Sequence, residues 1–318
     1  MAKRKFNKIK NKDATFNEAF NQFIEEKEAL NLSQSTIDNY YVTFDKVYNF
    51  FECTSDTLVK DFDLQMIFQW INDMWANDLR PQSVNHHLRN MRAFFNWCFE
   101  RRIIDERIKI QEVQVQENLP KMYEDEEIMK LLDKPGRTDS FRFWRSWAVI
   151  STIYATGLRA STICALRIQD LDYQREEIHI EKQKNKNAAI LPLTPALANT
   201  LKEYTRKWMP DAKPTDFVFP SITGEKISVS GLDRGIGAFC RSRGVKPHGV
   251  HSIRHNFARA MIVNGGGEYR LQKYLQHSTI AMSSHYVKLF NEDLKKDAIE
   301  FSPLDVVKRS KPSKFKRA

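Results

Sequence analysis

The chain has 318 residues, which is long enough for two domains with substantial cores. Apolar residues make up 42% of it, which excludes a disordered chain, and no window holds the roughly 18 apolar residues of a membrane span. The net charge is +10, but residues 1–12 and 308–318 each carry six basic residues and no acidic one. Removing these twelve from the 50 basic residues leaves 38 against 40 acidic, so the positive excess lies in two tails. Such tails suit non-specific phosphate contact or a disordered solubilising end.

The basic stretch 1–12 is not followed by the apolar segment of a secretory signal. The chain contains four scattered cysteines without a CxxC pair: Cys53, Cys98, Cys164 and Cys240. We therefore expect mostly buried free thiols in a reducing cytoplasm, rather than a disulfide or a zinc site.

Residues 13–104 are predicted to be helical. One helix is indicated by apolar residues at every third or fourth position, with Ser33 or Ser35 as its cap: Ile37, Tyr41, Phe44, Val47 (or Tyr48) and Phe51. Pro81 is predicted to begin another helix. Its apolar stripe is Val84, Leu88, Met91, Phe95 and Cys98.

A polar stripe runs beside this apolar one at the same helical spacing. It consists of Asn85, Arg89, Arg92 and Asn96. Such a stripe is either a solvated face or a surface for nucleic acid, because amides bind base edges and arginines bind phosphates.

Residues 105–121 lose the helical period and contain Pro120, which predicts a linker. Acidic residues at 124–127 begin the next helix, and an apolar helix over 141–154 leads to the motif ATGLRAS. Residues 177–192 alternate, turn through a Lys/Asn-rich stretch and end at Pro192, as in a β-hairpin. The expected fold class is therefore mainly α with a small antiparallel β-sheet.

The second domain contains four groups of polar residues that could take part in chemistry. In chain order they are Arg159 in ATGLRAS; Lys182, Lys184 and Lys186 in the hairpin turn; His248, His251, Arg254 and His255 in HGVHSIRH; and His277 and Tyr286 in LQHSTIAMSSHY. Taken singly, each fits a surface or turn residue. The three histidines of HGVHSIRH are also spaced like metal ligands, but no nearby carboxylate or thiol completes a site and Arg254 would repel a cation.

Together these residue types fit chemistry on a phosphodiester without metal or cofactor. Guanidinium groups bind the non-bridging oxygens and stay charged through the reaction. A tyrosine can attack phosphorus when a neighbour takes its proton, and the covalent intermediate conserves the bond energy for resealing. A lysine can protonate the departing oxygen as general acid.

The four motifs, in this order, resemble those of the tyrosine recombinase (phage integrase) family over residues 13 to about 290. The resemblance implies a SAM-like core-binding domain at 13–104 and a catalytic domain at 122–290. It implies that Arg159 and Arg254 bind the phosphate, that His251 acts as the partner of Arg254, and that His277 hydrogen-bonds the scissile phosphate. Tyr286 is then the nucleophile. Lys184 is the expected general acid, with Lys182 and Lys186 as the alternatives for that role and as DNA contacts. Thr162 stands where the family has Glu or Asp, and Gln276 where it has Gly.

The resemblance also implies double-stranded DNA with a specific site as partner, a 3′-phosphotyrosyl intermediate, and a tetramer that forms a Holliday junction. Within residues 291–318, the stretch 291–301 is expected to be an exchange helix on a neighbouring protomer, or to pack in cis, ahead of the basic tail. Accessory proteins are compatible with this reading, and a membrane is not expected. Two alternatives stay open: a degenerate DNA-binding regulator, and a type IB topoisomerase-like enzyme.

Overall fold

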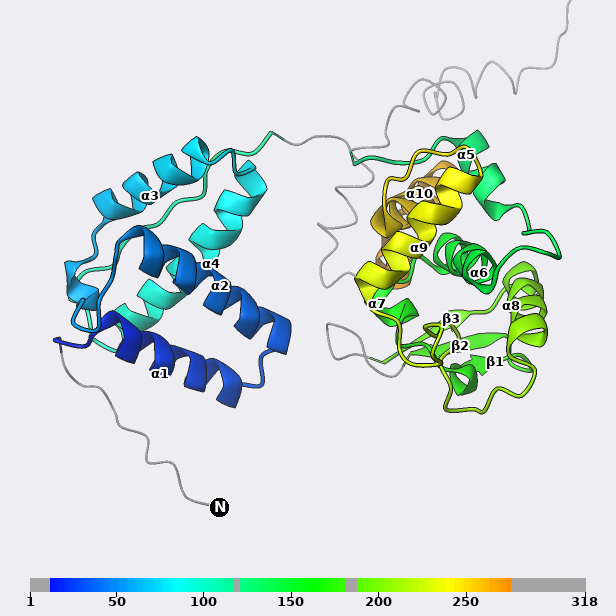
Figure 1. The fold of residues 1–318 in the computed structure, drawn as a ribbon, viewed down its shortest axis with the longest axis horizontal. Helices are drawn as coiled ribbons and strands as arrows, with labels where there is room; N and C mark the ends of the chain where they lie inside the picture. Colours follow the sequence, from blue (N-terminus) through cyan, green and yellow to red (C-terminus); the bar gives the residue numbers. More distant parts are fainter. Residues whose placement is uncertain (1–11, 117–119, 181–187, 276–318) are drawn as a thin grey trace, which may run out of the picture. The chain divides into compact units, whose positions relative to one another are not determined.

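The computed structural model describes residues 12–116, 120–180 and 188–275. The chain forms two compact units, Met1–Glu117 and Asn118–Ala318 (Figure 1). The division falls inside the stretch 105–121 that the sequence indicates as a linker. Within the described ranges, no helix has both the length and the apolar character needed to cross a bilayer.

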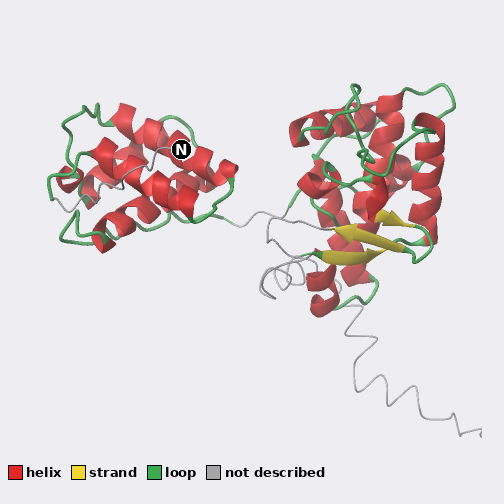
Figure 2. Ribbon diagram, turned by 90° about the horizontal axis from the view of Figure 1, so that it is seen from below, coloured by secondary structure: helices red, strands yellow, loops and turns green. Residues whose placement is uncertain are grey.

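The described part of the first unit is helical, as expected (Figure 2). Its α-helices are α1 (Phe16–Ala29), α2 (Gln34–Phe50), α3 (Leu64–Ala76) and α4 (Pro81–Glu100), with a short 3₁₀ turn η1 (Val59–Asp61). Pro81 is the first residue of α4, as predicted, because the missing N–H of proline costs nothing in a first turn. Ser33 is the N-cap residue of α2, and its hydroxyl lies 2.8 Å from that of Thr36.

Aromatic rings fill the core between these helices. Phe20 stacks on Phe44 at 3.8 Å between ring centroids, and Phe16 stacks on Phe44 at 4.7 Å. The predicted apolar stripe of α4 is buried along its whole length. Tyr41 is a correction: it is 42% exposed, because it lies at the margin of the α1–α2 contact, with only a ring edge against Phe20.

A buried polar chain crosses from α2 to α4. The Asn90 amide donates to the Thr43 hydroxyl at 2.9 Å, and that hydroxyl lies 2.9 Å from Nδ1 of His87. The hydroxyl has one proton and two lone pairs, so Nδ1 of neutral His87 accepts from it in one tautomer and donates to it in the other. Burial, together with the nearby Lys46 and His86, lowers the pKa of His87 to about 4.

We expect the first unit to lose stability as pH falls from about 6.5 towards 4. The folded-state pKa of His87 lies below the unfolded one, so the unfolded chain binds the extra proton in this window and the stabilisation present above pH 6.5 disappears. The loss is on the order of 3 kcal/mol. Denaturant unfolding of the full chain between pH 4 and 7, followed by tryptophan fluorescence, measures it.

His87→Asn is the informative variant, because its amide can keep the bond to the Thr43 hydroxyl as donor or acceptor but does not titrate in this range. We expect it to flatten the acid limb of the stability curve, while His86→Asn leaves that limb as in the wild type. Equal curves for wild type and His87→Asn would contradict the assignment.

The second unit is mostly helical around a small sheet, as expected (Figure 2). Its helices are α5 (Asp125–Leu132), α6 (Phe141–Thr156), α7 (Ala160–Ile163), the 3₁₀ turn η2 (Ile168–Asp170), α8 (Pro195–Trp208), α9 (Val229–Ser242), α10 (Val250–Val263) and α11 (Glu268–Leu275). Its strands are β1 (Leu171–Asp172), β2 (Glu177–Ile180) and β3 (Ala189–Pro192).

The strands form an antiparallel sheet in the order β1-β2-β3. Ile178 pairs with Leu171 on one side and with Leu191 on the other. Ile178 and Ile180 are buried and alternate with the half-buried Glu177 and His179, which is the predicted hairpin pattern. The sequence did not predict the short strand β1, since two residues carry no periodicity.

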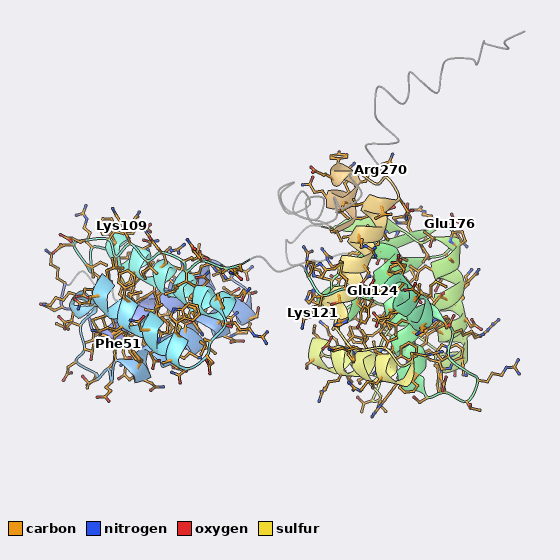
Figure 3. All side chains as sticks on the ribbon, turned by 90° about the horizontal axis from the view of Figure 1, so that it is seen from above. Phe51, Lys109, Lys121, Glu124, Glu176 and Arg270 are labelled. Atoms are coloured by element: carbon orange, nitrogen blue, oxygen red, sulfur yellow. The ribbon has the colours of Figure 1, made fainter. Side chains whose placement is uncertain are left out.

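Helix α6 lies inside the second unit and packs against α5, α8, α9 and α10 (Figure 1). It is apolar around most of its circumference, with Trp144, Val149 and Ile153 among its buried residues, as a helix enclosed by others must be. Figure 3 shows how side chains fill the space between the helices of each unit. All four cysteines are buried free thiols, as predicted.

Candidate active site at the α6–α7 junction and helix α10

Helix α6 ends in a left-handed turn that presents Arg159. Gly157 is the C-cap, with φ of +67°, and its N–H donates to the Ile153 carbonyl at 2.7 Å. The chain then turns extended, so that Arg159 becomes the N-cap of α7 with a half-buried side chain. A β-carbon on Gly157 would lie 2.5 Å from the Phe257 ring and 2.8 Å from Leu275. Only glycine fits the conformation and the space.

Helix α10 carries His251 and Arg254 in its first two turns. Its N-cap, Gly249, has no side chain, and the Asp233 carboxylate of α9 accepts instead from the Val250 N–H at 2.8 Å. A carboxylate at this end also complements the helix dipole. Helix α9 therefore fixes where α10 begins, and with it the place of the H-x-x-R pair.

Arg254 is buried, 7% exposed, and forms a fork between two carbonyl groups. Nη1 donates to the Gly157 carbonyl, and Nη2 donates to the Leu275 carbonyl at 2.8 Å. One guanidinium thereby joins the turn before Arg159 to the last residue of α11, directly before Gln276. The planar five-donor geometry of arginine suits such a double contact.

The positive charges of Arg159 and Arg254 both act on the His251 ring. Its pKa is lowered, first by partial burial of the ring among neighbouring atoms and then by the positive charges of Arg254 and Arg159, with Asp233 acting in the opposite sense. His251 is nevertheless exposed to solvent. The ring is therefore neutral near pH 7 and can accept a proton. The structure brings Arg159, His251 and Arg254 to one place, as the sequence pattern indicated.

Helix α10 is also tied to the start of the second unit. The Asn256 amide accepts from the Tyr123 N–H at 3.0 Å and donates to the Tyr123 carbonyl at 2.6 Å. The Tyr123 hydroxyl in turn accepts from the His248 N–H at 3.0 Å. The sequence analysis did not single out Tyr123 or Asn256. Their contacts join positions more than 120 residues apart, and no motif in the sequence indicates them.

Thr162, which stands where a carboxylate was expected, is buried beside a cavity of about 170 Å³. His179 and Ile180 of β2, together with Arg167, line the same cavity. The Thr162 N–H donates to the Arg159 carbonyl at 3.0 Å. Position 162 thus lies between Arg159 and the strand that leads into the hairpin turn.

Several predicted residues lie outside the described ranges. They are Lys182, Lys184, Lys186, Gln276, His277 and Tyr286, and the stretch 291–301 lies outside as well. Their roles stay predictions. Among the residues that the structure describes, no group of three or more His, Cys, Asp or Glu is placed to hold a metal ion.

The polar stripe of α4 contacts the segment that follows that helix. The Asn85 amide is 4% exposed and makes two bonds to the Val113 backbone, at 2.8 and 2.9 Å. Arg89 and Arg92 both pair with Glu112, at 2.9 and 3.3 Å. Asn85 therefore has a structural task, while DNA contact by Arg89, Arg92 and Asn96 stays a prediction.

The comparisons with known proteins agree with this arrangement. The model of the phage integrase family matches residues 121–293, and the model of the phage integrase SAM-like domain matches residues 15–112. The chain belongs to the phage integrase family. The two matched ranges correspond to the two compact units, so this integrase has the SAM-like and catalytic parts that its sequence indicated.

Curated relatives extend over most of the integrase. A tyrosine recombinase of Pseudothermotoga lettingae is 28% identical over 264 residues, covering 81% of this chain and 89% of the relative. The tyrosine recombinase XerC of Staphylococcus aureus is 22% identical over 277 residues, covering 86% and 92%. The integrase is accordingly a site-specific DNA recombinase of the tyrosine type.

Solved structures share the fold. A lambda integrase dimer bound to a core site has a TM-score of 0.68 at 15% identity, covering 86% of this chain and 77% of that one. The XerH recombinase bound to its palindromic difH substrate also has a TM-score of 0.68, at 19% identity, covering 89% and 85%.

Proposed function

We propose that the integrase cuts a DNA strand at a specific site by attack of Tyr286 on the scissile phosphorus. The tyrosine O–H bond breaks as its oxygen bonds to phosphorus, and the bond from phosphorus to the 5′-oxygen breaks in turn. The products are a 3′-phosphotyrosyl link and a free 5′-hydroxyl. Attack of another 5′-hydroxyl on that link reverses these steps and joins a new strand.

The observation that carries this proposal is the meeting of Arg159, His251 and Arg254 around the end of α6. Arg159 and Arg254 bind the non-bridging phosphate oxygens and offset the charge that develops on them. His251, held neutral by its surroundings, accepts the proton that Tyr286 releases. Lys184 protonates the departing 5′-oxygen, and His277 donates a hydrogen bond to the phosphate.

The assembly follows from the same proposal. Four copies act on two double-stranded sites and pass through a Holliday junction, with residues 291–301 contacting a neighbouring copy. A lambda integrase tetramer bound to a Holliday junction, with a TM-score of 0.68, supports this arrangement. Because the substrate is DNA and the curated relatives are bacterial, we expect the integrase to work in the cytoplasm, with or without accessory proteins.

Tyr286→Phe is expected to abolish the covalent complex while keeping DNA affinity within about twofold, because only the attacking oxygen is removed. The substrates are nicked duplexes from the DNA that flanks the gene, incubated in EDTA. A nick beside the cleavage point releases a short fragment and traps the intermediate. The readout is a slower, protease-sensitive band on a denaturing gel.

Three other outcomes would change the conclusion. Retarded DNA on a native gel without any covalent band in the wild type would favour a DNA-binding regulator. Thr162 motivates this candidate, since the buried position beside Arg159 supplies no charge. Relaxation of unrelated supercoiled DNA by monomers would instead favour a topoisomerase. A covalent band that forms only when EDTA is left out would contradict metal-independent cleavage.

A further inference from the structure

A second basic site lies beside the candidate active site. A cavity of about 860 Å³ opens between the first turns of α6 and α9 and the loop that precedes α9. Its lining contains four cationic side chains and no carboxylate: Arg142, Arg145, Lys226 and Arg234. The hydroxyls of Ser221 and Ser228 also line it and can donate hydrogen bonds to an anion.

These four charges are not neutralised by the described residues. None of the ion pairs within the described ranges includes them. The nearest carboxylates in sequence are Asp139, Glu225 and Asp233. Asp139 accepts from the Gly136 N–H, Asp233 caps α10, and the exposed Glu225 is not among the lining residues of the cavity. Arg145 is 5% exposed and donates one N–H to the Pro220 carbonyl, which fixes its guanidinium in the wall.

Two helix dipoles add to the positive potential. Helices α6 and α9 have 16 and 14 residues, and the N-terminal end of each borders the cavity. Ser140, the N-cap of α6, makes no side-chain capping bond, and Ser228 caps α9 through the Gly231 N–H at 3.1 Å. Unsatisfied N–H groups at a helix start attract anions, and here they supplement four fixed cations.

The cavity adjoins α7, whose N-cap is Arg159. Figure 1 shows α7 beside α9, and the two helices pack together. The other end of α9 lies at α5, where Arg243 bonds to the Asp133 carbonyl at 3.0 Å. Lys226 and Arg145 act electrostatically on Cys164, the residue directly after α7. A four-residue helix rises only about 6 Å, so Arg159 stands one short helix away from Cys164, the residue on which these two cavity cations act.

We propose that this cavity binds a backbone phosphate of the DNA duplex, separate from the scissile phosphate bound at Arg159. The proposal rests on the proposed function, because the duplex must reach Arg159. A contact of this kind is independent of sequence and sets the register of the strand against the nucleophile. Arg142 and Lys226, both exposed at the cavity, make the contact, and Arg145 orders the wall behind them.

The test compares the salt dependence of DNA affinity in the Tyr286→Phe background, where cleavage does not interfere. The probe is a 40-base-pair duplex of arbitrary sequence, titrated by fluorescence anisotropy between about 50 and 200 mM NaCl. Lys226→Gln and Arg142→Gln are each expected to reduce the slope of log K against log salt by about 1. The matched control is Arg206→Gln, which removes an exposed charge of α8 outside the cavity lining and should leave the slope unchanged.

A slope in both cavity variants equal to that of Arg206→Gln would overturn the proposal, provided that thermal melting shows all variants folded. A parallel calorimetric titration with inorganic pyrophosphate separates DNA from a small phosphate compound. Pyrophosphate binding lost in Lys226→Gln, together with an unchanged DNA slope, would assign the cavity to the small anion and also overturn it. A failure of the proposed function gives a different result, because the wild-type protein would then form no covalent band.

Discussion

Gly157→Ala is expected to destabilise the second unit by about 3 kcal/mol or more and to slow DNA cleavage by about 100-fold. The new methyl group would stand 2.5 Å from the Phe257 ring and 2.8 Å from Leu275, in a backbone conformation with φ of +67°. Phe257 lies on α10 and Leu275 ends α11, so the clash pushes the Gly157 turn and these two elements apart. We expect this shift to disturb the placement of Arg159 relative to His251 and Arg254. Denaturant unfolding and the rate of covalent complex formation measure the two effects.

Gly244→Ala is the matched control. Gly244 has nearly the same φ, +68°, but nothing lies within 4 Å of its added β-carbon. It isolates the cost of the left-handed conformation, about 1–2 kcal/mol, and should leave cleavage unchanged once the protein is folded. Equal destabilisation by both variants would mean that packing around Gly157 is looser than these distances indicate.

Arg254→Lys is expected to reduce the rate of cleavage by about 10²–10³-fold while DNA affinity changes little. Lysine keeps the positive charge, but its donors sit on one nitrogen at the end of a flexible stem. It therefore does not reproduce the separate bonds that Nη1 and Nη2 make to the Gly157 and Leu275 carbonyls. An unpaired buried carbonyl costs about 1–3 kcal/mol, which denaturant unfolding will show in the same variant. Single-turnover formation of the covalent complex separates the kinetic effect from binding.

Arg259→Lys provides the comparison on the same helix. Arg259 forms an exposed ion pair with Asp125 at 2.9 Å, and such pairs contribute at most about 1 kcal/mol. We expect wild-type cleavage and nearly wild-type stability. If Arg254→Lys cleaves DNA as fast as Arg259→Lys, the two bonds from Arg254 to the Gly157 and Leu275 carbonyls have no role in cleavage and are structural contacts only.

The sequence was informative wherever the signal is periodic or chemically rare. The apolar stripe of α4, the start of that helix at Pro81 and the alternation of Ile178 with Ile180 all follow from burying one face of a helix or strand. Arg159, two residues after Gly157, and the H-x-x-R spacing on α10 predicted a phosphate-binding site, and the structure brings these residues together. The order of these motifs also indicated the family, which the comparisons show.

Local patterns were incomplete where one helix face contacts another segment of the chain. The stripe containing Asn85 and Arg89 has the spacing of a solvated or DNA-facing surface, and its contacts with Glu112 and Val113 could not be predicted from that spacing. Tyr41 keeps the period of a core residue but lies at the edge of its helix pair. Periodicity reports which residues share a face, and it does not report what covers that face.

The sequence by itself determined that the chain has two largely helical parts, a hairpin and a set of arginine, histidine and tyrosine residues suited to a phosphodiester. Only the tertiary structure decided that Arg254 joins the Gly157 turn to the end of α11, that Asn256 holds Tyr123, and that cations from α6, α9 and the preceding loop meet in one cavity. The physical reason is separation along the chain, because hydrophobic periodicity and residue chemistry are properties of short stretches of sequence. A carbonyl's partner, or an uncompensated charge, depends on which distant segments the core brings together.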